Sequence, residues 1–222
     1  MKPYYQDDAV TIYHGDCWEI VPTLGRFDLL LTDPPYGIGA DMAAHKASGC
    51  VVGHGHRRVA KRVYQRSDWD ASPVDGATLA TVMGACDRQI VWGGNYFTLP
   101  PCKGPLIWDK QNDGNKFADA ELAWNNLGCP VRIKRHLWNG MARKGAEVRF
   151  DHPTQKPVEL MQWCITLASD VQTILDPFAG SCTTGRAAKD LGRKAVLIER
   201  EERYCEIGAK RMQQEVLPLY DE

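Results

Sequence analysis

The C-terminal third of the chain alternates between short apolar segments and amphipathic segments, and this order limits the fold more than any other feature. The pattern predicts strands at 173–175 and 195–198 and helices at 183–191 and from about residue 202. Strands joined through a helix run parallel, and their helices cover the sheet. The order therefore predicts an α/β fold with a mostly parallel, doubly wound sheet.

The N-terminal part continues the same alternation. Residues 27–31 form a continuous apolar run, which is typical of a strand buried on both faces. Pro157 suits the first turn of a helix whose apolar stripe includes Leu160 and Ile165. The other predicted elements are strands at 10–13, 89–92, 106–108, 120–124 and 133–138 and helices at 17–24 and 74–86.

Positive charge gathers in two segments of a chain whose net charge is only −1. Residues 41–66 and 130–150 each carry a net charge of +5, so the rest of the chain is acidic. Localised positive charge favours contact with a polyanion, and the alternative is two solvated loops. The length of 222 residues suits one domain, so we expect a single domain over 1–222 with basic insertions at about 37–72 and 110–151.

Several protein classes do not fit this composition. No apolar run approaches the 18 residues that a membrane-spanning helix needs, and we expect neither a signal peptide nor a membrane partner. The eight cysteines are scattered without a Cys-x-x-Cys pair, which favours reduced thiols and a cytoplasmic protein over a disulfide framework.

A cluster of potential metal ligands lies in the first basic segment. His45, Cys50, His54 and His56 fall within twelve residues, but their spacing matches no standard zinc motif. We interpret the segment as a basic loop that contacts the polyanion, and we expect no metal. A metal site is the alternative.

The tetrapeptide Asp33-Pro34-Pro35-Tyr36 directly follows the buried strand and carries a coherent chemistry. Two prolines remove backbone donors and stiffen the loop, which leaves carbonyl oxygens available as acceptors. A carboxylate and a proline carbonyl together can accept both protons of an exocyclic amino group. The tyrosine ring offers a face on which a planar base can stack. An ordinary turn at the end of a strand is the alternative.

A second candidate site is the small-residue turn at 175–185, between a strand and a helix. Such a turn lets a ligand approach the backbone and the helix N-terminus. Glu199 ends the next strand, 23 residues after Asp176, where an acid can bind both hydroxyls of a ribose. A phosphate-binding dinucleotide loop is the rival interpretation, but the glycines of G-x-G-x-x-G are not all present.

Three segments resemble, in order, the signature motifs of S-adenosylmethionine-dependent DNA amino-methyltransferases. They are 33–36 (Asp-Pro-Pro-Tyr), 152–157 (His-Pro-Thr-Gln-Lys-Pro) and 176–181 (Asp-Pro-Phe-Ala-Gly-Ser). The catalytic loop precedes the cofactor loop, which is similar to the circularly permuted β group of the family. The resemblance implies a Rossmann-like methyltransferase fold. Asp33 and Asp176 lie 143 residues apart, yet we expect them to end adjacent parallel strands.

The resemblance also implies a role for individual residues. Asp33, Pro34, Pro35 and Tyr36 are expected to be catalytic, and Asp33 also to lie beside the cofactor. Double-stranded DNA is the expected substrate, and S-adenosylmethionine the cofactor. The expected cofactor-binding residues are Asp16, Cys17, Thr154, Lys156, Pro157, Asp176, Phe178, Gly180, Ser181, Thr183 and Glu199, and the expected DNA-binding residues are Arg57, Arg58, Lys61, Arg62, Arg132, Lys134 and Arg135.

The chain departs from the family at Cys182, where glycine is usual. If this position needs a positive φ, a cysteine costs about 1 kcal/mol and crowds the cofactor turn. A DNA-binding protein that has lost its cofactor is therefore one alternative function.

The function that these motifs imply is methyl transfer to N6 of a flipped-out adenine in duplex DNA. N4 methylation of cytosine, which is the same attack by an exocyclic amine, is the other alternative. The short insertions leave little room for a recognition domain, so we expect a short target sequence or joint reading by a homodimer.

Overall fold

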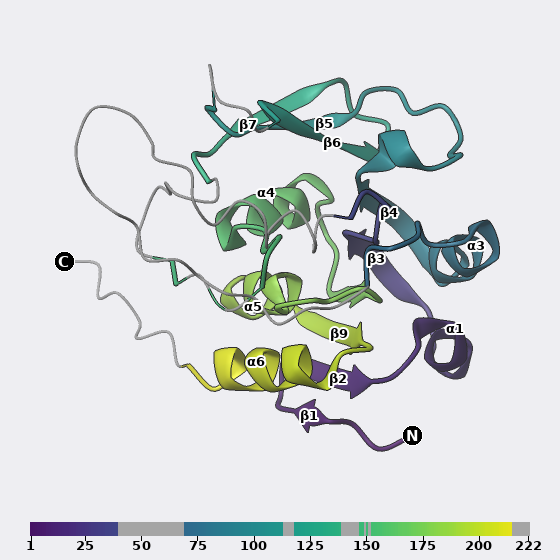
Figure 1. Ribbon diagram of the computed structural model, residues 1–222, viewed down its shortest axis with the longest axis vertical. Coiled ribbons are helices and arrows are strands. Elements are labelled where there is room, and N and C mark those ends of the chain that lie inside the picture. Colours follow the sequence, from purple (N-terminus) through teal and green to yellow (C-terminus); the bar gives the residue numbers. More distant parts are fainter. Residues whose placement is uncertain (40–68, 113–117, 139–146, 149, 151, 215–222) are drawn as a thin grey trace.

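The computed structural model describes residues 1–39, 69–112, 118–138, 147, 148, 150 and 152–214. A nine-stranded sheet runs through them in the order β1-β2-β9-β8-β3-β4-β6-β5-β7 (Figure 1). The strands are β1 (Tyr5–Gln6), β2 (Val10–His14), β3 (Phe27–Thr32), β4 (Cys86–Trp92), β5 (Leu106–Asp109), β6 (Ala120–Asn125), β7 (Arg132–Arg135), β8 (Thr173–Asp176) and β9 (Lys194–Glu199). The helices are α1 (Cys17–Ile20), α3 (Gly76–Gly84), α4 (Val158–Leu167), α5 (Thr183–Asp190) and α6 (Glu202–Met212), with 3-10 turns η1 (Val21–Thr23) and η2 (Gly94–Tyr96).

The centre of the sheet is parallel. The pairs β2–β9, β9–β8, β8–β3 and β3–β4 all run in the same direction. Antiparallel pairing joins β1 to β2 at one edge and β6 to β4 and β5 toward the other. The predicted α/β fold with a mostly parallel sheet is confirmed, and the carboxyl ends of five adjacent strands meet along one edge.

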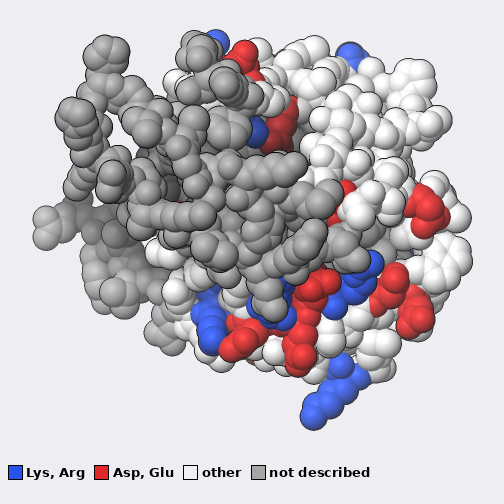
Figure 2. Space-filling model, in the orientation of Figure 1, with Lys and Arg blue, Asp and Glu red and all other residues white. Residues whose placement is uncertain are grey.

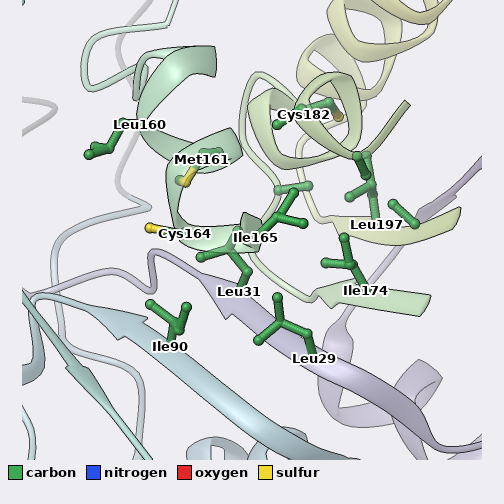
Figure 3. Close-up of a cluster of buried hydrophobic side chains, with 14 of the residues drawn as sticks. Leu29, Leu31, Ile90, Leu160, Met161, Cys164, Ile165, Ile174, Cys182 and Leu197 are labelled. Atoms are coloured by element: carbon green, nitrogen blue, oxygen red, sulfur yellow. The ribbon is translucent and has the colours of Figure 1, made fainter. Parts of the chain in front are cut away.

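Helices cover both faces of the sheet (Figure 1). Leu29 and Leu31 of β3 point to the face covered by α4, α5 and α6, whereas Leu30 between them points to the face covered by α1 and α3. This alternation follows from the two-residue period of a strand. Figure 3 shows Leu31 beside Ile165 of α4, and Leu29 beside Ile174 of β8.

Several predicted element boundaries differ from the structure. The helix expected at 74–86 begins at Gly76, where the Asp75 carboxylate accepts hydrogen bonds from the backbone of Ala77 and Thr78. It ends at Gly84, so Cys86 already belongs to β4. The strand β7 ends at Arg135, three residues before the predicted end. Among the described residues, no helix is long and apolar enough to cross a membrane.

Candidate active site

Two loops meet at the carboxyl ends of neighbouring strands. Asp33 follows β3, and Asp176 is the last residue of β8, which pairs directly with β3. The Thr32 hydroxyl donates to Asp176 Oδ1 at 2.8 Å, so the two strand ends are also joined through side chains. The expected adjacency of Asp33 and Asp176 is therefore confirmed, at the sheet edge where open α/β folds bind their ligands.

The Asp33–Tyr36 loop is held by a buried carboxylate. Asp70 Oδ1 accepts hydrogen bonds from the backbone N–H groups of Tyr36 and Gly37, at 2.7 and 2.8 Å. The Pro35 carbonyl accepts from the backbone N–H of Val74 at 3.2 Å. The loop is thus fixed from a segment more than thirty residues away in sequence. The motif alone gave no signal for Asp70.

The side chain of Asp33 is bound on both oxygens. Oδ1 accepts a hydrogen bond from the Tyr36 hydroxyl, and Oδ2 lies 2.5 Å from Lys156 Nζ. Burial raises the pKa of the Asp33 carboxyl, while the Lys156 ammonium acts in the opposite direction. A second carboxylate, Glu121 of β6, lies 3.1 Å from the same ammonium group.

The ring of Tyr36 also contacts aromatic residues from outside the loop. The Tyr36 ring stacks on the half-exposed ring of Tyr96 of η2, with 4.7 Å between centroids and 14° between planes. Phe97 meets the Tyr36 ring edge-on at 6.2 Å. Gly93 has no room for a side chain, because a Cβ would lie 2.0 Å from the Tyr36 ring.

Lys156 connects the Asp33 loop to the turn after β8. Its side chain binds Asp33, while its backbone carbonyl accepts from the Thr183 hydroxyl at 3.1 Å. Lys156 is buried and lies just before α4, in the segment that also includes Thr154 and Pro157. A single residue therefore contacts both candidate sites.

The turn between β8 and α5 is built around Glu199. Its Oε2 accepts from the backbone N–H of Gly180 at 2.7 Å, and its Oε1 accepts from the backbone N–H of Glu201 at 2.7 Å. Burial raises the pKa of Glu199 to about 7. Gly180 has a positive φ of 49°, and a Cβ there would lie 2.8 Å from His152 Nε2. Only glycine fits this position.

Asp176 holds the same turn from inside. Its Oδ2 accepts from the Thr184 hydroxyl at 2.6 Å, and its Oδ1 accepts from the backbone N–H of Phe178 at 3.2 Å. Burial raises the pKa of Asp176 to about 6. Together with the hydrogen bond from Thr32, these contacts make Asp176 a residue that shapes the turn.

Arg211 of α6 also supports the turn, and it was not among the residues predicted from the sequence. It is 2% exposed and donates to the Ser181 carbonyl at 3.0 Å and to the Thr183 hydroxyl at 2.9 Å. Its other nitrogen lies 2.7 Å from Glu147 Oε1. An arginine near the end of a charged helix has no local sequence signal, because its partners come from two segments that are distant in sequence.

Cys182 does adopt the left-handed backbone conformation, with φ 58° and ψ 36°. Its side chain is fully buried in the core cluster beneath α6 (Figure 3). The position thus requires the conformation that glycine adopts most easily.

The remaining predicted cofactor residues fall beside this turn. Strands β2 and β9 end side by side, with His14 opposite Glu199. Asp16 follows as the exposed N-cap of α1, where it accepts from the backbone N–H of Trp18, and Cys17 is buried. The structure therefore brings the ends of β2, β9, β8 and β3 together in one row.

The predicted DNA contacts are only partly within the described residues. Arg57, Arg58, Lys61 and Arg62 lie outside them, as does the cluster from His45 to His56. The others lie on β7, where Lys134 pairs with Glu159 at 2.6 Å, Arg135 pairs with Asp109 at 3.2 Å and Arg132 is exposed. On the face in Figure 2, most of the described Lys and Arg side chains gather along the lower part of the molecule, beside Asp and Glu.

Similar sequences identify the family. The family model described as DNA methylase matches residues 61–210. Type II methyltransferase M2.MboI of Moraxella bovis is 42% identical, over 99% of this chain and 93% of that protein. Type II methyltransferase M.HinfI of Haemophilus influenzae is 34% identical, over 96% of this chain and 71% of that protein.

Solved structures agree with the fold. The PvuII DNA methyltransferase, described as cytosine-N4-specific, has a TM-score of 0.61 and 17% identity, and the match covers 97% of this chain and 90% of that one. A complex of M1.HpyAVI with S-adenosylmethionine has a TM-score of 0.54 and 21% identity, with 91% and 99% covered. These likenesses support a Rossmann-like methyltransferase fold. The family model and the two relatives above show that the chain belongs to the N6/N4 DNA methylase family.

Proposed function

We propose that the chain transfers a methyl group from S-adenosylmethionine to N6 of adenine in double-stranded DNA. The observation that carries this proposal is the position of Lys156. Its ammonium group contacts Asp33, and its carbonyl oxygen accepts from Thr183. The site assigned to the target amine and the turn assigned to the methyl donor are therefore joined by a single residue.

The turn after β8 fits an adenosine derivative. Glu199 is buried at a strand end, and its oxygens keep acceptor capacity beyond the two backbone N–H groups they bind. Gly180 brings no side chain of its own to the turn, and the ring of His152 packs against the side where a Cβ would project. We assign Glu199 to the ribose hydroxyls and Asp16 to the adenine. The methionine part is assigned to Asp176, Phe178, Gly180, Ser181, Thr183 and the segment with Thr154, Lys156 and Pro157.

The chemistry assigned to the Asp33 loop is positioning and electrostatics. S-adenosylmethionine supplies a methyl group on a sulfonium, which is a good leaving group. The Asp33 carboxylate and the Pro34 carbonyl accept the two amino protons of the target base, which directs the nitrogen lone pair toward the methyl carbon. Pro35 keeps the loop rigid, and the Tyr36 ring stacks on the base.

The target amine lies inside duplex DNA, so the base must be flipped out to reach Asp33. We assign the basic segments, including Arg57, Arg58 and Arg132, to the phosphate contacts that hold the duplex. The order of the loops, with Asp33 before Asp176, supports membership of the circularly permuted β group. Aspartate at the first motif position favours adenine over cytosine.

The test is incubation with S-adenosylmethionine labelled in the methyl group and unmethylated genomic DNA, followed by digestion to nucleosides. Labelled N6-methyladenine is the expected product. Labelled N4-methylcytosine would show that cytosine is the target base and would leave the proposed mechanism unchanged. Absence of label, together with absence of cofactor binding in calorimetry, would leave a DNA-binding protein without methyl transfer.

A further inference from the structure

Two carboxylates share the ammonium group of Lys156. Its Nζ lies 2.5 Å from Asp33 Oδ2 and 3.1 Å from Glu121 Oε2. Because both acids touch one nitrogen, they lie within about 6 Å of each other, close enough for strong electrostatic coupling. The Lys156 side chain is only 6% exposed, so water screens these charges weakly.

Glu121 is itself fixed in place. It lies on β6, opposite Trp108 of β5, and its second oxygen pairs with Lys110. The Lys110 ammonium is also held over the Trp108 ring, 4.7 Å from the centroid. Although burial acts to raise it, Lys156 and Lys110 lower the pKa of Glu121 to about 2. Glu121 is therefore ionised throughout the neutral pH range.

The charges of this cluster matter for the reacting amine. Asp33 and Lys156 alone form a neutral pair, which would offer little negative charge to a nitrogen that becomes cationic. Glu121 contacts the same ammonium group and offsets its positive charge, while Lys110 partly neutralises Glu121 in turn. We propose that Glu121 is a positioning residue of the transfer reaction, holding Lys156 and offsetting its charge so that Asp33 stays available to the target amine.

This inference rests on the proposed function. The target nitrogen uses its lone pair to bond the methyl carbon while the carbon–sulfur bond breaks, and that bond's electron pair stays on sulfur. The nitrogen then carries one positive charge. It releases one proton to the Asp33 carboxylate, which passes the proton to water. Negative charge at Asp33 favours both stages, and an unopposed Lys156 disfavours both.

Titratable groups from four segments face Asp33. Tyr36 belongs to its own loop, Lys156 precedes α4, Glu121 lies on β6, and Asp176 ends β8. Burial raises the pKa of Asp33, Lys156 lowers it, and Glu121 raises it. Loss of the Glu121 charge alone should therefore make Asp33 a weaker base.

The test compares Glu121→Gln with Lys110→Met, two substitutions that change the same cluster in opposite ways. In Glu121→Gln we expect kcat to fall about tenfold and the affinity for S-adenosylmethionine to stay within about twofold. The acidic limb of the profile of kcat against pH should move to lower pH. In Lys110→Met the Glu121 charge is less neutralised, so the limb should move to higher pH. Glu206→Gln, which removes one exposed ion pair on α6, is the matched control and should leave the profile unchanged.

An unchanged kcat in Glu121→Gln, or a loss of kcat with an unmoved acidic limb, overturns the proposal, because a purely structural role would not shift the profile. If Glu121→Gln does not fold, Lys110→Met decides by the direction of its shift. A carbon-13 NMR titration of the Asp33 carboxyl in wild type and Glu121→Gln, without DNA, gives an independent readout. A wild type that transfers no methyl group overturns the proposed function, whereas an unchanged Asp33 titration overturns the role of Glu121.

Discussion

Cys182 and Gly208 fit together: the cysteine sulfur occupies the space that a side chain at position 208 would need. A Cβ on Gly208 would lie 2.3 Å from Cys182 Sγ. The backbone of Cys182 is left-handed, and its thiol packs beneath α6 in the hydrophobic core. The residue that departs from the family pattern is thus accommodated by a missing side chain on a helix 26 residues away.

We expect Gly208→Ala to lower the free energy of unfolding by about 1–3 kcal/mol, because the new methyl group overpacks the core. The double variant Cys182→Gly/Gly208→Ala should recover most of this loss. Urea unfolding measures the free energy of unfolding of the single and the double variant. Gly84→Ala is the control, since a Cβ there meets nothing within 4 Å. Additive effects of the two substitutions would contradict the predicted contact.

Cys182→Gly alone should change stability little. Relief of the left-handed backbone gains about 1 kcal/mol, and loss of the buried thiol costs a similar amount. We expect the variant to bind S-adenosylmethionine no worse than the wild type in calorimetry. A wild type that fails to bind at millimolar cofactor while Cys182→Gly binds would show that the cysteine has disabled the site.

Asp33→Ala and Glu199→Ala should separate chemistry from cofactor binding. Asp33 lies on the loop assigned to the target amine, so its loss should abolish methyl transfer while the cofactor still binds. Glu199 anchors the turn through Gly180 and is assigned to the ribose, so its loss should weaken cofactor binding by about tenfold or more. Calorimetry measures cofactor binding in each variant, and an assay with labelled methyl groups measures methyl transfer. Equal loss of cofactor affinity in both variants would refute this division.

The sequence predicted the parallel centre of the sheet because its signals are local. The run at 27–31, the Asp33 tetrapeptide and the turn around Gly180 each carry their pattern within a few residues. Their adjacency followed from topology, since parallel strands align their carboxyl ends.

The supporting residues could not be predicted from local patterns, because each contacts a segment far away in sequence. Asp70 binds backbone at Tyr36, Glu121 contacts Lys156, and Arg211 reaches the turn before α5. A lone acid on a short strand or a lone arginine in a charged helix is common, so its partner cannot be recognised before the chain is folded.

Asp70 provides a test of how the Asp33 loop is held. Asp70 is 1% exposed and accepts two backbone hydrogen bonds from residues 36 and 37. Asp70→Ala should lower the free energy of unfolding by about 1–3 kcal/mol and abolish methyl transfer, with cofactor binding retained. Asp70→Asn keeps an oxygen acceptor and should retain much of the activity. Full activity in Asp70→Ala would show that the prolines fix the loop unaided.

The pH dependence of cofactor binding should report on Glu199. Its pKa is raised by burial from 4.5 to about 7, and the ionised form is the better acceptor for ribose hydroxyls. We expect the Kd for S-adenosylmethionine to rise as pH falls from about 8 to 6. The folded protein without cofactor has the opposite preference: the stability from protonated Glu199 is complete below pH 4.5 and is lost as pH rises through about 7. Calorimetry across this range should give a shallower profile for Glu199→Gln, in which Asp176, with a pKa of about 6, still titrates at the acidic end. An equally steep profile in that variant would assign the titration elsewhere.

The basic segments should be distinguishable by the salt dependence of DNA binding. Each lost phosphate contact makes the slope of log affinity against log salt shallower by about 0.9 for duplex DNA. Alanine at Arg57, Arg58, Lys61 and Arg62 should therefore weaken binding to all sequences and flatten the slope. On β7, Arg135 already pairs with Asp109, whereas Arg132 is exposed, so Arg132→Ala should change the slope more than Arg135→Ala. Fluorescence anisotropy at several salt concentrations measures each slope. Slopes equal to that of the wild type in every variant would show that both segments are solvated surface and that the duplex is held elsewhere.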